Sequence, residues 1–261
     1  MGSTIEKLTR ILTPLKLGAW QHYSTLESTN DLALAWLQQG TPDWSLILAD
    51  EQTAGRGRNQ RPWLTKPGSG LAMSLAFRLN PVEQSHVPRF TALAALSLVK
   101  VLVSHGLEAE IKWPNDILLC GKKAGGVLVE ADWVGDELLG LVIGMGVNVG
   151  VESVPTTRLR YPAISIEEAL GEQMDRWELL ANILKEMKVF RHTLPDQDFV
   201  DLWNAKLAFR GQWIRFKERG ETVQRVKLLG VSGEGELRLL QEDGIKKTAI
   251  DGEIVMAVSD T

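Results

Sequence analysis

The segment EQTAGRGRNQRPW, residues 51–63, places three arginines and two glycines in a short stretch with no acidic side chain after Glu51. Arg56, Arg58 and Arg61 can each form bidentate contacts with phosphate or carboxylate, and an arginine keeps its charge at any ordinary pH. The glycines let backbone N–H groups approach an oxygen-rich ligand. The segment matches neither a P-loop nor a G-x-G-x-x-G motif. Taken alone, it fits an anion-binding loop and a solvated surface turn equally well.

The composition is that of a globular chain. The 261 residues are 44% hydrophobic, and 29 basic against 33 acidic side chains give a net charge of −4. This length fits one large domain, or one domain with a small appendage. The charge balance does not favour a broadly basic nucleic-acid-binding face, so the clustered cations indicate a small anionic ligand.

Cysteine content and the N-terminus exclude further classes. Cys120 is the single cysteine, so an intramolecular disulfide and a multi-cysteine zinc site are excluded. We expect Cys120 to be a small core residue. Residues 1–20 contain no long apolar run, which predicts a cytoplasmic protein with no signal peptide and no membrane partner.

Hydrophobic patterning predicts alternating strands and helices. Ser28 and Asp31 have the spacing of a capping box at a helix start, and Gly40 supplies its end. The remaining predicted elements are strands over 45–50, 71–79 with one apolar face, 107–113 and 137–150, a hairpin whose turn carries Lys122 and Lys123, helices over 89–106, 174–194 and 197–208, and an irregular loop over 151–162.

The pattern changes near residue 211. Five short strands separated by Gly, Glu and Asp turns follow, which is typical of a small antiparallel barrel. We therefore expect a catalytic domain over 1–208 and a small C-terminal β-barrel domain over 209–261.

A second polar cluster lies at KWPND, residues 112–116. Lys112, Asn115 and Asp116 crowd around Pro114, which makes a rigid turn, and could bind phosphate and position Mg²⁺. A polar turn with Asn and Asp caps is the alternative. Further along, Lys122 or Lys123 could lie above Gly125 and Gly126, and Asn148 could satisfy backbone groups or bind a base edge; each of these signals is weak alone.

Taken together and in this order, the motifs ESTN (27–30), GRGRNQRPW (55–63), KWPND (112–116), GKKAGGVLVE (121–130) and GMGVNV (144–149) resemble the biotin protein ligase family. The resemblance implies an α+β fold: a class II synthetase-like catalytic domain with a central mixed or antiparallel sheet flanked by helices, and a small C-terminal β-barrel.

The resemblance also implies a two-step ligation. A biotin carboxylate attacks the α-phosphate of ATP, with Mg²⁺, to give biotinyl-5′-AMP and pyrophosphate. A lysine of the biotin carboxyl carrier protein of acetyl-CoA carboxylase then attacks the mixed anhydride. The two anionic substrates repel each other, and fixed cations would offset that repulsion. A monomer or a homodimer is expected.

The matching positions imply roles for individual residues. The catalytic residues would be Arg56, Lys112 and Lys123. Biotin would contact Ser28, Thr29, Asn30, Gln52, Gly55, Arg56, Lys123, Gly125 and Gly126. ATP and the adenylate would contact Arg58, Arg61, Trp63, Lys112, Asn115, Asp116 and Asn148, and Asp116 would bind the metal.

The chain departs from the family in two places. Asn59 and Gln60 stand where the family commonly has an arginine and a glycine, so the loop loses one charge and one flexible hinge. Too few residues precede ESTN for an N-terminal DNA-binding domain, which predicts a monofunctional enzyme with no nucleic-acid partner. The rival interpretations are a lipoate-protein ligase, a biotin-sensing regulator and a module that binds adenylates without turnover.

Overall fold

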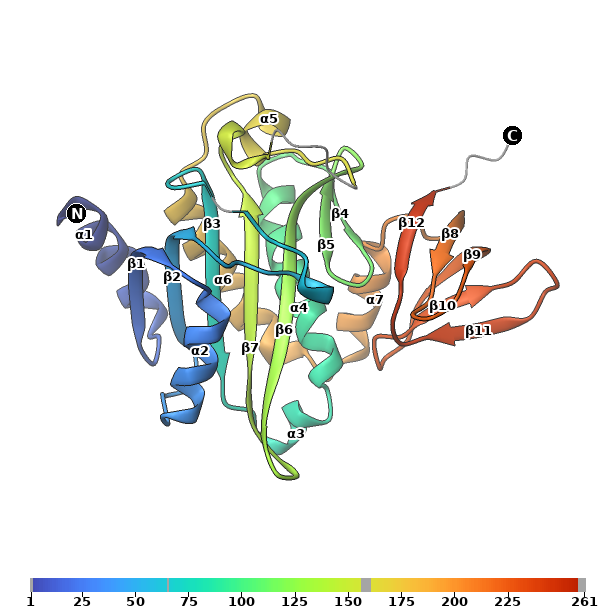
Figure 1. Ribbon diagram of the computed structural model, residues 1–261, viewed down its shortest axis with the longest axis horizontal. Helices are drawn as coiled ribbons and strands as arrows, with labels where there is room; N and C mark the ends of the chain where they lie inside the picture. The colour runs from blue at the N-terminus through green and yellow to red at the C-terminus, as the bar shows by residue number, and fades with distance from the viewer. Residues whose placement is uncertain (1, 65, 156–160, 258–261) are drawn as a thin grey trace.

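A seven-stranded mixed sheet forms the centre of the molecule (Figure 1). The structure is a computed structural model that describes residues 2–64, 66–155 and 161–257. The strand order is β1-β2-β3-β7-β6-β5-β4; β1 is parallel to β2 and the other pairs are antiparallel. The strands are β1 (Trp20–Leu26), β2 (Ser45–Gln52), β3 (Gly70–Phe77), β4 (Ala109–Lys112), β5 (Asp116–Leu119), β6 (Lys122–Val134) and β7 (Glu137–Asn148).

Helices cover both faces of this sheet. α2 (Thr29–Gln38) packs on one face, and α4 (Phe90–Ser104) packs with α6 (Arg176–Thr193) on the other. The predicted strand over 71–79 is confirmed as β3: Leu71, Met73, Leu75 and Phe77 share one face and one core cluster, and the opposite face is buried as well. The other helices are α1 (Gly2–Leu12), α3 (Pro81–Gln84), α5 (Ile166–Leu170) and α7 (Gln197–Ala205).

The helix predicted after Ser28 is confirmed as α2. The Ser28 hydroxyl accepts a hydrogen bond from the Asp31 backbone N–H at 3.3 Å, which satisfies one of the free donors at the helix start. The reciprocal bond of a full capping box, from the Ser28 backbone N–H to the Asp31 side chain, is not found in the described chain; the Asp31 carboxylate pairs with Arg56.

α4 is the most apolar helix of the described chain. Val87–Ser104 is the one stretch among the described residues whose length and composition would suit a membrane span, and 67% of it is buried inside the protein. The predicted helix over 89–106 is confirmed, and its side chains form much of the core beneath the sheet.

The β5–β6 hairpin corrects two details. Its turn is formed by Cys120 and Gly121, both in the left-handed region, whereas Lys122 and Lys123 already belong to β6. Cys120 is exposed and not in the core, because it occupies a tight turn that projects beyond the paired strands. The predicted irregular loop is partly described: Val151–Ser153 forms a short 3-10 helix, and residues 156–160 lie outside the described residues.

The five predicted C-terminal strands form a second sheet, in the order β11-β10-β9-β8-β12. In the described part of the chain β11 and β12 do not pair, so the sheet is open and the prediction of a closed barrel was wrong. The edge strand β11 has only four residues, and all of them pair with β10. The strands are β8 (Trp213–Lys217), β9 (Val223–Val231), β10 (Leu237–Leu240), β11 (Lys246–Ala249) and β12 (Glu253–Ala257).

Candidate active site

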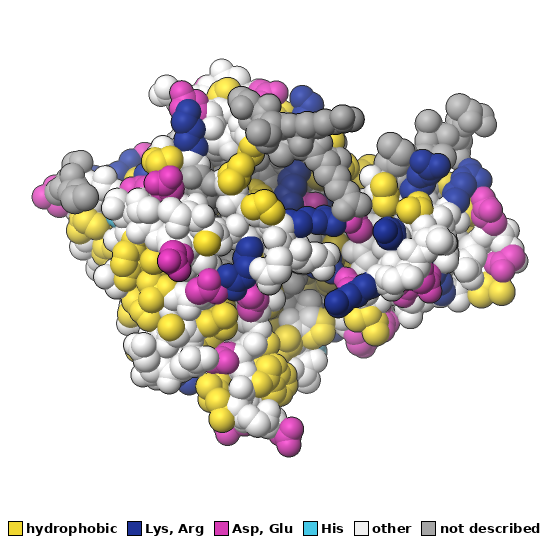
Figure 2. Space-filling view, in the orientation of Figure 1, with side chains coloured by type: hydrophobic (Ala, Val, Ile, Leu, Met, Phe, Trp, Pro, Cys, Tyr) yellow, Lys and Arg dark blue, Asp and Glu magenta, His cyan; other side chains and the backbone are white. Residues whose placement is uncertain are grey.

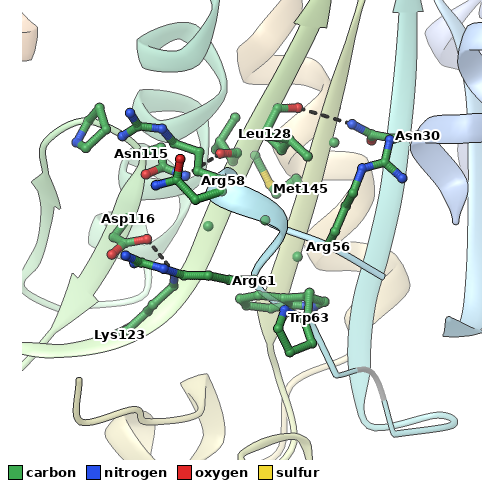
Figure 3. A pocket seen from close by; sticks show the side chains of 18 of the residues that line it. Asn30, Arg56, Arg58, Arg61, Trp63, Asn115, Asp116, Lys123, Leu128 and Met145 are labelled. Atoms are coloured by element: carbon green, nitrogen blue, oxygen red, sulfur yellow. Dashed lines mark hydrogen bonds and ion pairs between the residues drawn. The ribbon is translucent and has the colours of Figure 1, made fainter. Parts of the chain in front are cut away.

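A cavity of about 130 Å³ opens on the face of the central sheet that carries α2, beneath the loop over residues 55–63 and beside the C-terminal sheet (Figure 3). Figure 2 shows Lys and Arg side chains gathered in this hollow, with acidic side chains among them. Of the residues predicted for the site, the lining includes Ser28, Thr29, Asn30, Gln52, Arg56, Arg58, Arg61, Trp63, Lys112, Asn115, Asp116, Lys123 and Gly126.

The start of α2 forms one end of the cavity with interlocked polar groups. Thr29 donates from its backbone N–H and its hydroxyl to Oε1 of Gln52, at 2.8 and 3.0 Å. The buried Ser74 hydroxyl lies 2.7 Å from the Thr29 hydroxyl and 2.6 Å from Oδ1 of Asn30. Asn30 Nδ2 donates to Glu130 at 2.7 Å. These bonds hold a row of donors and acceptors in fixed positions, as recognition of a polar ligand requires.

Glycines of β7 form the floor. A Cβ at Gly144 would overlap the Asn30 amide, and a Cβ at Gly146 would overlap the indole ring of Trp63. Residues two apart in a strand point to the same face, so α2 and the loop 55–63 each place one side chain directly on the floor. Trp63 thereby covers one end of the cavity, with Lys123 Nζ 5.6 Å from the centre of its ring.

Two lysines share one carboxylate at the opposite wall. Lys123 Nζ lies 2.5 Å from Oδ1 of Asp116, and Lys112 Nζ lies 3.8 Å from Oδ2 of the same side chain. Asn115 holds the turn that carries Asp116: its Nδ2 donates to the Val127 carbonyl at 2.6 Å, and its carbonyl accepts from the Val127 N–H at 2.9 Å. The Trp113–Pro114 peptide at this turn is cis.

Lys112 is a buried cation. Only 3% of it is exposed, and its Nζ lies 4.0 Å from the centre of the Tyr161 ring. Burial lowers the pKa of Lys112 below its usual 10.5, and Asp116 partly opposes this shift. A desolvated ammonium interacts strongly with any anion that enters the cavity, because little water screens it.

Arg56 is fixed at the base of the loop. Its guanidinium pairs with Asp31 at 2.5 and 2.7 Å and with Glu130 at 3.1 and 3.2 Å. The hydrogen bond from Arg56 holds the pKa of Asp31 below its usual value. Arg56 therefore ties the loop to α2 and β6 through two carboxylates, neither of which was predicted as a partner of Arg56.

The tip of the loop pairs with the C-terminal sheet. Arg58 Nη2 bonds Oδ1 of Asp251, and Arg61 binds both carboxylate oxygens of Glu253, at 2.8 and 3.1 Å. Asn59 and Gln60 both adopt left-handed backbone conformations, with φ of 56° and 57°. That conformation favours glycine, so Gln60 adds local strain to the tip.

Three predicted residues are not among those lining the cavity. A Cβ at Gly125 would face the Gly146 carbonyl and Leu98, in the core. Gly55 lies at the neck of the loop, where its carbonyl accepts from the Trp63 N–H at 2.7 Å. The Asn148 amide donates to the carbonyls of Lys123 and Ile164 at 3.4 and 3.3 Å, as a buried side chain that satisfies backbone groups.

Other lining residues were not assigned to the site by sequence reasoning. Several of them lie within the two quoted motifs over 51–63 and 112–116, which was a signal for them. The alternation of Gly144 and Gly146 within an apolar strand was another, since paired strand glycines often mark a close approach. The remaining apolar residues and the C-terminal turn carried no local signal. The missed lining residues are Gly57, Asn59, Pro62, Met73, Trp113, Pro114, Val127, Leu128, Gly144, Met145, Gly146, Gly252 and Glu253.

No group of three or more His, Cys, Asp or Glu among the described residues could hold a metal ion on its own. Asp116 nevertheless fits Mg²⁺ that arrives with a nucleotide, because such ions are usually held by one or two carboxylates together with substrate phosphates. The arrangement as a whole can bind two anions in one partly dry hollow, with fixed cations on several sides.

Comparison with known proteins agrees with this geometry. Residues 22–148 match the family model described as "Biotin/lipoate A/B protein ligase family". The chain is 34% identical over 232 residues to the "Bifunctional ligase/repressor BirA" of Bacillus subtilis, covering 87% of this chain and 70% of that protein. It is 30% identical over 191 residues to the "Biotin--[acetyl-CoA-carboxylase] ligase" of Paracoccus denitrificans, covering 70% and 77%.

A solved structure is also similar. The biotin protein ligase from Aquifex aeolicus in complex with biotin and ATP matches with a TM-score of 0.75 and 28% identity, covering 90% of this chain and 97% of that one. The likeness therefore extends over both sheets.

Proposed function

Because the chain belongs to the biotin/lipoate protein ligase family, we propose that it joins biotin to ATP and then transfers the biotinyl group to a lysine of a biotin carboxyl carrier protein. The observation that carries the proposal is the shared hollow: Lys112, Lys123 and the arginine loop converge on one cavity whose other end is lined by the fixed polar groups of Thr29, Asn30 and Gln52.

In the first step a biotin carboxylate oxygen forms a bond to the α-phosphorus of ATP, and the bond from that phosphorus to pyrophosphate breaks. Two like unit charges 4 Å apart repel by about 4 kcal/mol at an effective dielectric constant near 20. Lys123 and Lys112 are the cations proposed to offset this repulsion and the charge that grows in the transition state. Proton transfer is not required, because a carboxylate is already a nucleophile.

Asp116 is the proposed ligand of Mg²⁺. When bound, Mg²⁺ neutralises phosphate charge and orients the pyrophosphate leaving group. Asp116 would then exchange its contact with Lys123 for the metal, which frees the Lys123 ammonium for the substrates.

In the second step a lysine amine attacks the carbonyl carbon of the anhydride, AMP leaves with the phosphate oxygen, and the amine loses a proton. Trp63 and the arginine loop are proposed to cover the adenylate until the carrier protein arrives. The carrier of acetyl-CoA carboxylase is the proposed partner, since the Paracoccus relative is a ligase for that enzyme. We also propose that the protein is cytoplasmic and that the boundary between its two domains lies between residues 208 and 209.

The test measures pyrophosphate release from ATP and Mg²⁺ with biotin, with lipoate and with neither. We expect release with biotin alone, followed by biotin on an added carrier domain. Equal or greater release with lipoate would move the protein to the lipoate branch of the family. Tight biotinyl-5′-AMP binding without pyrophosphate release would identify a binding module or regulator.

A further inference from the structure

The turn that joins β11 to β12 forms part of the cavity wall. Gly252 and Glu253 line the cavity, and Asp251 and Glu253 receive the two arginines at the tip of the loop. These contacts join residues that are more than 190 positions apart in the chain. The two-step ligation proposed above assigns no role to either carboxylate.

The Asp251 carboxylate is oriented by contacts within the protein. Its Oδ1 accepts the backbone N–H of Gly252 at 2.8 Å and also bonds Arg58. A Cβ at Gly252 would overlap the Phe216 ring, and its φ of 154° is one that residues with side chains rarely adopt. Glycine therefore lets the turn lie against Phe216 and fixes the direction in which Asp251 points.

The two arginines are held differently. Arg61 forms a bidentate contact with Glu253, in which each terminal nitrogen donates to one carboxylate oxygen. Arg58 gives one nitrogen to Asp251, and no other side-chain hydrogen bond of Arg58 is found within the described chain. A guanidinium carries five N–H donors, so Arg58 keeps several for an incoming anion while Arg61 is largely engaged.

The C-terminal sheet is attached to the central body independently of these pairs. Arg89 Nε donates to the Gly233 carbonyl at 2.7 Å, and Trp113 Nε1 donates to the Gly235 carbonyl at 3.0 Å. Trp113 also packs against Phe216, with ring centres 6.1 Å apart. Loss of the Asp251 charge should thus leave the sheet in place.

We propose that Asp251 is a positioning residue that aims Arg58 into the cavity, and that Glu253 tethers Arg61 so that the loop tip rests on the C-terminal sheet. This inference rests on the proposed function for its kinetic consequence only. The positioning itself depends only on contacts within the protein. The C-terminal sheet then contributes to the reaction by holding Arg58, the residue proposed to bind phosphate. The sheet itself supplies no group that touches the reacting atoms.

Asp251→Asn is the decisive variant, because the amide oxygen can still accept the Gly252 N–H while the charge is lost. In the ligand-free protein we expect trypsin to cut the Arg58–Asn59 bond about fivefold faster, as befits a partly exposed pair worth about 1 kcal/mol. Asp251→Glu, which keeps the charge, should recover most of the protection. High salt should bring the wild type towards the variant, because it screens this pair.

The kinetic readout is the release of biotinyl-5′-AMP. Asp251→Asn should raise both the off-rate of biotinyl-5′-AMP and the KM for ATP about fivefold. Biotin affinity in the absence of ATP should not change, and neither should the thermal midpoint. Asp243→Asn, an acidic residue in the β10–β11 turn away from the loop, is the matched control and should behave as wild type. Arg89→Ala is a second comparison. It should weaken the attachment of the C-terminal sheet to the central body without removing a contact of the loop over residues 55–63.

The outcomes separate the explanations. Wild-type cleavage and off-rates in Asp251→Asn would overturn the proposal. An equal effect from Arg89→Ala would show that the sheet acts only by docking. If the wild-type protein released no pyrophosphate with biotin, the proposed function would fail while the proteolysis comparison still tested the positioning.

Discussion

Lys123 and Lys112 approach the same carboxylate from two sides, with Asp116 2.5 Å from the first ammonium and 3.8 Å from the second. One negative charge thus faces two positive ones inside a cavity where little water screens them. The excess positive charge makes this wall a site for an anion, and it explains why the lysines are expected to matter more than their neighbours.

Lys123→Ala should slow biotin-dependent pyrophosphate release by at least two orders of magnitude. That loss corresponds to roughly 3 kcal/mol, which is typical of removing one contact to a developing oxyanion. Lys122→Ala is the matched control, because the half-buried Lys122 does not line the cavity and pairs with Glu168 at 3.6 Å. If Lys122→Ala slowed pyrophosphate release while Lys123→Ala kept the wild-type rate, Lys122 would take the role assigned here to Lys123.

Raising the pH should act on Lys112 in two opposite ways. Its folded-state pKa lies below 10.5, the value expected in the unfolded chain, so between these two values the unfolded state binds more protons. In that window the contribution of Lys112 to the free energy of unfolding rises with pH, because the buried ammonium becomes neutral. Activity falls through the same window, since a neutral amine does not stabilise phosphate.

The measurement compares urea midpoints and pyrophosphate release between pH 8 and pH 10.5 in the wild type and in Lys112→Met. The rise in midpoint that belongs to Lys112 should disappear in the variant. Parallel midpoint curves for the two proteins would show that Lys112 does not titrate there.

Gly146→Ala should displace Trp63 from the floor of the cavity. The added methyl group would overlap the indole ring, so the ring must leave β7. We expect weaker ATP binding, by about tenfold, with little change in thermal midpoint because Trp63 is only partly buried. Gly57→Ala in the same loop is the control, since a Cβ there would meet no atom closer than 3.9 Å. Unchanged ATP titrations in Gly146→Ala would remove Trp63 from the nucleotide site.

Arg58→Gly should still make the adenylate but release it about ten- to a hundredfold faster, as expected for loss of a charge-assisted phosphate contact of roughly 1.5–3 kcal/mol. Free biotinyl-5′-AMP would then label lysines of an unrelated bystander protein, detected by a biotin blot. Arg219→Gly, which removes an exposed arginine from the turn between β8 and β9, should not release the adenylate faster than the wild type. Bystander labelling at the wild-type level, with carrier labelling intact, contradicts the role.

The sequence predicted the elements well where periodicity or apolar length was strong. The strand over 45–50 and the helices over 89–106 and 174–194 correspond to β2, α4 and α6, because each has a long apolar pattern with clear ends. Short amphipathic elements such as α1 and α5 were not predicted. β3 is buried on both faces because helices from two distant segments cover it, which a local pattern cannot reveal.

The candidate site was likewise predicted where a local motif carried the signal and missed where it depended on tertiary contacts. Motifs predicted half of the cavity-lining residues, 13 of 26, but they did not predict that Arg56 would pair with Glu130 or that Arg58 would meet Asp251. An Asp-Gly turn looks like any other turn in a sequence. Its position beside the loop depends on how the second sheet docks, which is a tertiary property.

The close fit of Asn30 on Gly144 also restricts how this family can vary. Asn30 fills the space that any side chain at 144 would need, while its amide links Ser74 to Glu130. A larger residue at 144 therefore requires a smaller one at 30, and the smaller one breaks that link. A side chain at 144 clashes with Asn30, a smaller residue at 30 leaves a gap above Gly144, and the double change relieves both but still loses the polar network. The two positions should behave as an epistatic pair, with each single substitution more harmful than its chemistry alone would indicate, and homologous chains should change them together or leave both as they are.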